Sequence, residues 1–210
     1  MNGEGNENLT LDYTPGINTF EPSLDGLIMR KELDDALFKM KCNKSPGPDG
    51  ILTEYLKYFL LLAVNLKLIR VMFAHQIYPT MWNLNYLKPI YKKGDPTDPQ
   101  NFRGLAIAPS IAKLHGLILL NRLTKYVQKN HLISNRQIGF TEGAQTSDHI
   151  FLLQTIVEKT VKKNKKRLFC VFVDFKKAYD LVDREKLLKK LQRIGVNGIF
   201  FRNIVAMYEN

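Results

Sequence analysis

The stretch Phe172–Asp183 holds three aspartates beside an apolar run, and carboxylates in that setting can do phosphoryl-transfer chemistry. A carboxylate is costly to bury unless it is paired or holds a metal. A site that binds two Mg²⁺ ions needs hard oxygen ligands from a few carboxylates and from the substrate phosphates. Asp174 is therefore a candidate metal ligand. The alternative is a structural aspartate that caps the following helix or pairs with Lys176 or Lys177, and spacing alone does not separate the two.

A second group of residues is basic and lies in the middle of the chain. The alternation of the strand predicted at Tyr86–Lys93 places Lys88 and Lys92 on one face. Arg103 lies near the start of a second predicted strand, and its guanidinium fork can bond two phosphate oxygens at once. These cations are candidates for binding phosphate, although a solvated basic hairpin has the same pattern.

Extended elements and one helix must position these side chains. Leu168–Phe175 is rich in β-branched and aromatic residues and predicts a buried strand with Asp174 near its end. The following helix is predicted over residues 183–194, with Asp183 as its N-cap and Gly195 as its stop. Tyr86–Lys93 and Asn101–Ala108, joined by a Gly/Pro/Asp turn, predict a β-hairpin.

The remaining elements are predicted to be helical, separated by loops. Apolar spacing predicts helices over residues 27–40, 110–128 and 147–161, the last with Thr146 or Ser147 as N-cap. The most apolar stretch, residues 51–73, is interpreted as a buried helix, because charged side chains make it too short to span a membrane. The core side of the helix over residues 110–128 is predicted to consist of Leu114, Leu117, Ile118, Leu120 and Leu123.

The composition is that of a globular protein with an uneven charge. The 210 residues include 31 basic and 20 acidic side chains, a net charge of +11. The first 35 residues hold eight acids and two bases (−6), so the remaining 29 bases and 12 acids give +17. That excess favours a polyanionic partner such as nucleic acid, although a soluble protein with a basic pI is equally compatible. Two distant cysteines argue against a disulfide scaffold and a zinc site, and the polar start lacks the pattern of a signal peptide.

Four motifs occur in an order that resembles the reverse transcriptases of non-LTR (LINE-type) retrotransposons, over about residues 25–210. Phe172-Val-Asp-Phe-Lys-Lys-Ala-Tyr-Asp-Leu-Val-Asp183 resembles the first palm motif of that family. The other three are an opening loop, Asn43-Lys-Ser-Pro-Gly-Pro-Asp-Gly50; a fingers hairpin, Pro89–Pro96 followed by Asn101-Phe-Arg103; and Gln137-Ile-Gly-Phe140 with Thr146-Ser-Asp-His-Ile150.

The resemblance implies an α+β fold, with the fingers of a right-hand polymerase at residues 26–165 and the first part of the palm at 166–210. The acidic, Gly- and Asn-rich start of the chain predicts a loose segment at 1–25. It implies that Asp174 and the backbone carbonyl of Phe175 bind a catalytic Mg²⁺ or Mn²⁺ ion. Tyr179 is then expected to lie under the sugar of the incoming nucleotide and to exclude a 2′-hydroxyl. Arg103 and Lys92 are expected to hold the triphosphate.

The nucleic acid is expected to contact Lys44, Lys88, Gln137 and Gly139. For Gln137 and Gly139 ordinary turn chemistry is an equally good interpretation. The implied partners are an RNA template, a DNA primer or RNA–DNA hybrid, and deoxynucleoside triphosphates. The polar start and the interrupted apolar stretch lead us to expect no membrane partner and an intracellular location, in the nucleus or cytoplasm.

The chain also departs from the pattern of the family. Ala144 stands where the family usually has an arginine, and the later motif, an aromatic residue followed by Ala-Asp-Asp, does not occur in these 210 residues. One carboxylate cannot hold two metal ions, and the helix after the first palm strand would carry Asp180 and Asp183 away from it. We therefore expect a fragment, with fingers and part of a palm, that is inactive alone and has an exposed sheet edge prone to pairing. Two alternatives are a non-catalytic nucleic-acid-binding remnant and an intron maturase related to polymerases.

Overall fold

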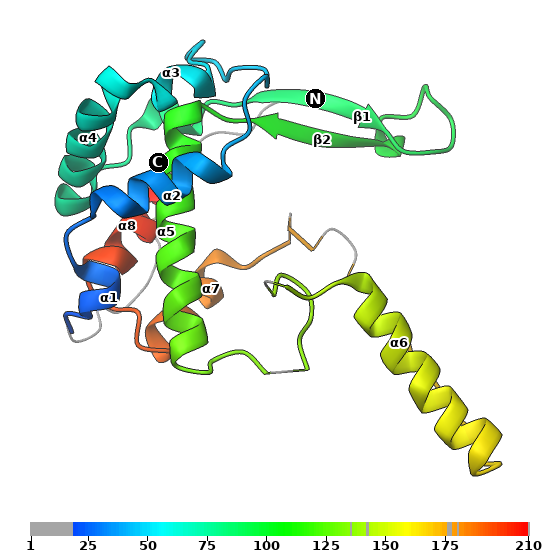
Figure 1. Cartoon of the computed structure of the whole chain (residues 1–210). Helices are drawn as coiled ribbons and strands as arrows, with labels where there is room; N and C mark the ends of the chain where they lie inside the picture. Colours follow the sequence, from blue (N-terminus) through cyan, green and yellow to red (C-terminus); the bar gives the residue numbers. More distant parts are fainter. Residues whose placement is uncertain (1–18, 135, 142, 176–177, 180, 210) are drawn as a thin grey trace. The chain divides into compact units, whose positions relative to one another are not determined.

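The computed structural model describes residues 19–134, 136–141, 143–175, 178–179 and 181–209 (Figure 1). Contacts within the chain divide it into two compact units. The first unit combines Met1–Tyr126 with Asp183–Asn210, and the second is Val127–Val182. Most of the predicted loose segment lies outside the described residues, and its last four residues form a short helix, α1 (Pro22–Asp25). The predicted boundary between fingers and palm stays a prediction.

Helix α2 (Arg30–Lys39) confirms the first predicted helix and begins three residues later than expected. Glu32 fixes its start, because the side-chain carboxylate accepts a hydrogen bond from the backbone N–H of Met29 at 2.8 Å. The buried face of the helix consists of Leu33, Ala36 and Leu37.

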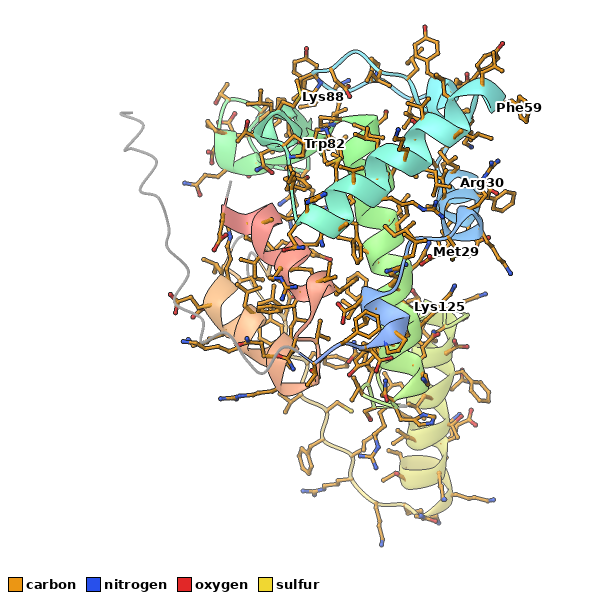
Figure 2. The ribbon with its side chains drawn as sticks, turned by 90° about the vertical axis from the view of Figure 1, so that its left-hand side faces the viewer. Met29, Arg30, Phe59, Trp82, Lys88 and Lys125 are labelled. Carbon is orange, nitrogen blue, oxygen red and sulfur yellow. The ribbon has the colours of Figure 1, made fainter. Side chains whose placement is uncertain are left out.

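The single buried helix predicted over residues 51–73 is wrong in two respects. The segment forms α3 (Thr53–Lys57), a 3₁₀ turn (Phe59–Leu61) and α4 (Leu62–His75), because Tyr58 adopts an extended backbone (φ −65°, ψ 128°) that interrupts the helix. The outer side of the segment is exposed as well as apolar, with Phe59 pointing away from the ribbon in Figure 2. A stretch that is apolar on every side therefore does not reveal which side is buried. The residues of α4 that face the core are Asn65, Ile69, Met72 and Phe73.

The hairpin predicted between residues 86 and 108 is confirmed. Its strands are β1 (Tyr86–Tyr91) and β2 (Phe102–Ile107), which pair in antiparallel orientation. A 3₁₀ turn at Thr80–Asn83 precedes β1, and another at Pro99–Asn101 leads into β2. The described residues are thus mostly helical with one small antiparallel sheet, which confirms the coarse α+β class.

Helix α5 (Ser110–Lys129) confirms the predicted helix and corrects its buried side. Leu114 and Ile118 are buried as expected, whereas Leu120 is 56% exposed. Leu117 and Leu123 are half-buried. The buried stripe instead includes two polar residues, His115 and Arg122, which an apolar pattern cannot indicate. No helix in the described part of the chain is both long and apolar enough to cross a membrane.

Arg122 explains why a cation lies in this core. Its Nε and Nη2 atoms donate to the two carboxylate oxygens of Glu32 at 2.6 and 2.9 Å, and its Nη1 donates to the carbonyls of Leu24 and Gly26 at 2.6 and 2.8 Å. The guanidinium also lies 5.0 Å from the centroid of the Phe73 ring. Burial opposes ionisation of Glu32, but the hydrogen bond from Arg122 holds the pKa of that carboxyl below its ordinary value. One side chain thus joins α5 to the segments around α1, α2 and α4.

Two helices complete the first unit. Helix α7 (Arg184–Arg193) is capped by Asp183, whose carboxylate accepts from the backbone N–H of Lys186 at 3.0 Å. Gly195 follows with φ 92°, so both predicted signals of this helix are confirmed. Helix α8 (Ile199–Glu209) was not predicted.

A carboxylate from the first described helix holds the start of the last one. Asp25 is 5% exposed, and its side chain accepts hydrogen bonds from the backbone N–H groups of Phe200 and Glu21, both at 2.8 Å. A negative charge is favourable at the N-terminus of a helix such as α8. Gly198 permits this approach, because a Cβ at that position would overlap the carboxylate of Asp25.

The second unit contains α6 (Thr146–Val157), which continues as a π-helical turn (Glu158–Lys163). The helix confirms the prediction, but its N-cap is Gln145, one residue before the predicted candidates. The backbone N–H of Gln145 donates to the side chain of Asp148 at 2.7 Å.

The strand predicted at residues 168–175 is wrong, because this segment is neither paired nor buried. Phe169, Val171 and Phe172 are 84–88% exposed. A strand is stabilised by the hydrogen bonds of its neighbours, and within the described residues β1 and β2 pair only with each other. Apolar composition alone therefore does not determine whether a segment has neighbouring strands to pair with.

Candidate functional site

The hairpin gathers three of the predicted cations on one face. Ile90 lies opposite Arg103 in the register, and Lys88 lies opposite Leu105. Side chains at opposite positions share a face, as do those two residues apart along a strand. Arg103 therefore stands diagonally across from Lys88. The backbone N–H of Lys92 donates to the carbonyl of Asn101 at 2.9 Å, so the pairing extends beyond β1 and places Lys92 on the same face.

These cations are available to a ligand. Lys88, Lys92 and Arg103 are all exposed, and the structure shows no ion pair for them among the described residues. Three positive charges within a few residues repel one another unless an anion neutralises them. The face therefore suits a phosphate group or a chain of phosphates.

A hydrogen-bonded turn supports the outer end of this face. Asp95 accepts from the backbone N–H and the hydroxyl of Thr97 at 2.8 and 2.7 Å, and these bonds hold the pKa of its carboxyl below the ordinary value. The side chain of Asn101 donates to the backbone carbonyl of Asp95 at 2.9 Å. The hydroxyl of Tyr91 donates to the carbonyl of Gly94 at 2.6 Å. The second acid of the turn, Asp98, accepts from the backbone N–H of Gln100 at 2.9 Å, so both acids are engaged within the turn.

The loop that carries Lys44 is anchored beside the base of the hairpin. Gly47 packs against the backbone of Ala108 and Pro109, where a Cβ would lie 2.6 Å from the nearest atoms. The hydroxyl of Ser110 donates to the carbonyl of Ile51 at 2.8 Å. Lys44 is exposed on this loop. The structure thus brings the predicted rigid loop and the end of β2 together within one unit.

Gln137 and Gly139 lie in an exposed turn of the second unit. The carbonyl of Gln137 accepts from the hydroxyl of Thr141 at 2.9 Å, and its backbone N–H donates to the carbonyl of Ser134 at 2.9 Å. These bonds are ordinary turn chemistry, one of the two interpretations left open by the sequence.

Asp174, Phe175 and Tyr179 also belong to the second unit. Asp174 is exposed in the segment that was expected to be a strand, Phe175 is 78% exposed and Tyr179 is 81% exposed. The expectation that a buried strand aims Asp174 at an open edge is therefore not met. Within the described residues, no three acidic, histidine or cysteine side chains gather to form a metal site.

The other two aspartates of the motif have different outcomes. Asp180 lies outside the described residues. Asp183 caps α7, and its carboxylate also lies 2.9 Å from the ammonium group of Lys186. Hydrogen bonds from the side chain and backbone of Lys186 hold the pKa of Asp183 below its ordinary value. Asp183 is therefore a structural residue.

The C-terminal part of the chain decides the family. A family model described as reverse transcriptase (RNA-dependent DNA polymerase) matches residues 90–210. The chain belongs to the reverse transcriptase family. The resemblance to non-LTR retrotransposon enzymes, inferred from four motifs, is confirmed by its relatives.

Three relatives illustrate the relationship. A probable RNA-directed DNA polymerase from transposon BS of Drosophila melanogaster is 26% identical over 78% of this chain and 18% of the relative. A Pol polyprotein from the type-1 retrotransposable element R2 of Popillia japonica is 29% identical over 81% of this chain and 23% of its own length. The RNA-directed DNA polymerase from mobile element jockey of D. melanogaster is 25% identical over 78% of this chain and 18% of its own length. The chain spans about a fifth of the length of these relatives.

Proposed function

We propose that this reverse transcriptase chain is part of an RNA-directed DNA polymerase of a mobile element, and that the hairpin face is where it binds the triphosphate of the incoming nucleotide. The family match supports the reaction class, and the three unpaired cations support the location. Residues 26–165 then act as fingers and residues 166–210 as the first part of the palm. The substrates are deoxynucleoside triphosphates and an RNA template with a DNA primer.

Arg103 is the central residue of the proposed nucleotide site. It stands opposite Ile90 at the middle of the face, between the positions of Lys88 and Lys92. A guanidinium binds two phosphate oxygens in a fixed geometry, whereas the two lysines add point charges that adjust to the ligand. Lys44, on the loop anchored at the hairpin base, extends the positive surface toward the nucleic-acid backbone. Tyr179, Gln137 and Gly139 keep the roles that the family pattern implies.

The proposed metal ligands are Asp174 and the backbone carbonyl of Phe175. Both offer hard oxygen atoms, which Mg²⁺ prefers, and a Mg²⁺ ion commonly takes one or two carboxylates together with substrate phosphates. The ion would neutralise charge on the phosphates during nucleotidyl transfer. Asp174 and Phe175 together supply a partial ligand set, so further carboxylates are needed for two ions.

Nucleotide binding can be tested without turnover. We expect calorimetric titration with dTTP and Mg²⁺ to show binding that Arg103→Ala weakens at least about tenfold, since charge-assisted hydrogen bonds contribute about 1.5–3 kcal/mol. Arg103→Lys should restore part of the loss. Arg30→Ala, which removes an exposed arginine of α2, is the matched control and should change nothing. Unaltered binding by Arg103→Ala would place the triphosphate elsewhere.

Polymerisation is tested by primer extension on poly(rA)/oligo(dT) with Mg²⁺. We expect the 210 residues alone to yield no product, because Asp174 cannot hold two ions by itself. A product that disappears in Asp174→Asn would show that the chain completes its own metal site.

A second candidate function is binding of nucleic acid without catalysis. The exposed position of Asp174, outside any strand, favours it. For the longer polymerase that would contain this chain, this candidate predicts no primer extension and hybrid binding that is unchanged by Asp174→Asn.

A further inference from the structure

Helix α7 is the most densely basic helix of the first unit. Its ten residues include five bases, Arg184, Lys186, Lys189, Lys190 and Arg193, and a single acid, Glu185. Helix α2 has the same length but balances three bases with three acids. The five basic side chains of α7 are all exposed.

The apolar side of α7 is already used within the unit. Leu188 is fully buried and Leu191 is 8% exposed, and the helix packs against α8. What α7 presents to solvent is therefore mainly charge, with only the half-buried Leu187 adding apolar surface. A helix that binds in a membrane interface inserts an apolar face into the lipid, and the two buried leucines of α7 are already used within the unit.

Weak pairing leaves most of this charge available. Lys186 pairs with Asp183 at 2.9 Å and Lys189 pairs with Glu185 at 3.7 Å, but every side chain in these pairs is at least 44% exposed. Such surface pairs contribute little and exchange easily for another anion. Lys190 and Arg193 have no acidic partner among the described residues.

The spacing of these cations matches an extended anion. Lys186, Lys190 and Arg193 stand at positions i, i+4 and i+7, which share one side of a helix. They span about 10 Å along the axis, at a rise of about 1.5 Å per residue. A row of this length suits successive phosphates of a nucleic-acid backbone better than a single small anion.

The position of α7 separates this row from the hairpin. The hydroxyl of Tyr126 donates to the carbonyl of Ile194 at 2.8 Å, so the end of α7 lies beside the last turns of α5. The hairpin ends at Ile107, just before α5 begins at Ser110. Figure 1 shows the hairpin and α7 toward opposite ends of α5. Sixteen residues of helix separate Ser110 from Tyr126, which corresponds to about 24 Å, or about seven base steps of duplex.

We propose that the exposed face of α7, formed by Lys186, Lys189, Lys190 and Arg193, is a second surface that binds the phosphate backbone of nucleic acid. It goes beyond the proposed nucleotide site, because it uses other residues at the far end of α5 and requires no triphosphate. Contacts of this kind hold the nucleic acid in position without reading its sequence.

The test is binding of a fluorescein-labelled 20-base-pair RNA–DNA hybrid, followed by anisotropy between 50 and 200 mM salt. Each phosphate contact contributes about 0.9 to the slope of log K against log salt. The double variant Lys190→Gln/Arg193→Gln should therefore reduce that slope by about 1.8. Raising the salt from 50 to 200 mM weakens the binding of both chains, and the factor by which it weakens binding should be about ten times smaller for the variant than for the parent chain.

The matched control removes two exposed lysines from α2 and α4, as Lys31→Gln/Lys67→Gln, and should leave the slope unchanged. An equal change in both variants would show an effect of net charge alone and overturn the proposal. So would an unchanged slope in the α7 variant. The chain is also titrated with vesicles of phosphatidylcholine and phosphatidylserine. Binding to these vesicles that is tighter than binding to the hybrid, and that the α7 variant abolishes, would assign the face to a membrane instead. The nucleotide-site proposal is tested by dTTP binding of Arg103→Ala, and the α7 proposal is tested by the salt dependence of hybrid binding. Because the two measurements are independent, either proposal can fail while the other holds.

Discussion

Lowering the pH from 7.5 to 5 is expected to destabilise the first unit through one buried imidazole. His115 is fully buried on α5, and neither of its ring nitrogens has a hydrogen-bond partner among the described residues. Its ring lies 5.8 Å from that of Trp82 and 6.1 Å from that of Tyr78, centroid to centroid. With no acceptor to stabilise a charge, burial lowers the pKa of His115 to about 4 from an ordinary value of 6.5.

The direction and the size of the effect follow from this pKa. Between about pH 6.5 and pH 4 the unfolded chain binds a proton at this position and the folded chain does not, so the free energy of unfolding falls as the pH falls. The loss amounts to about 2 kcal/mol between pH 7.5 and 5, and about 3 kcal/mol by pH 4. The pKa values of Glu32, Asp95 and Asp183 are also lowered, but from ordinary values of 4.5 for Glu32 and 3.8 for the two aspartates. These carboxylates therefore affect stability at a lower pH than His115 does.

Urea unfolding at a series of pH values measures the effect. Trp82 is the single tryptophan of the chain and is 6% exposed, so its fluorescence reports the neighbourhood of His115, and circular dichroism checks that the whole unit unfolds with it. His115→Leu keeps a similar volume without a titrating group and should reduce the change between pH 7.5 and 5 to below about 0.5 kcal/mol. The reasoning is refuted if the parent chain loses no stability over this range, or if His115→Leu loses as much as the parent.

Two further predictions concern the stability of the first unit. Arg122→Ala leaves the Glu32 carboxylate and two carbonyls without their donor, so it should lower the free energy of unfolding by about 3–5 kcal/mol in urea denaturation. The control, Lys125→Ala, removes an exposed neighbour and should change the free energy of unfolding by less than about 0.5 kcal/mol. Equal losses in the two variants would contradict the bonding described for Arg122. Gly198→Ala should destabilise the first unit by about 1–3 kcal/mol, because the new Cβ overlaps the Asp25 carboxylate. Gly116→Ala lies within α5 with open space around it and should stabilise the same unit by about 0.5–1 kcal/mol. The same denaturation curves test this pair, and a neutral Gly198→Ala would show that Asp25 moves freely.

The sequence predicted the elements whose signals are local. Asp183 and Gly195 bracket α7, and both act within a few residues of themselves. The hairpin was predictable because alternation and a Gly/Pro/Asp turn define register and connection together. The cation face followed from the same alternation, since Lys88 and Lys92 are separated by an even number of residues.

Features that depend on distant partners were missed. Nothing near Arg122 in the sequence indicates that Glu32, ninety residues earlier, neutralises it in the core. Residues 168–175 have the composition of a buried strand, but a strand also needs neighbours, which composition does not provide. The break at Tyr58 was hidden for a similar reason, because apolar residues surround it on both sides.

The hydrogen bond from Phe200 to Asp25 has a consequence for the order in which the chain folds during synthesis. The two residues are separated by 175 positions. A ribosome adding about 5–20 residues per second needs about 10–35 s to make that stretch. During this interval Asp25 lacks the more distant of its two native donors, the N–H group of Phe200, and the surface of α1 that packs against α8 stays open to other chains and to chaperones. The first unit is therefore expected to complete its core late in synthesis, and its contact order predicts slower folding than its helical content suggests.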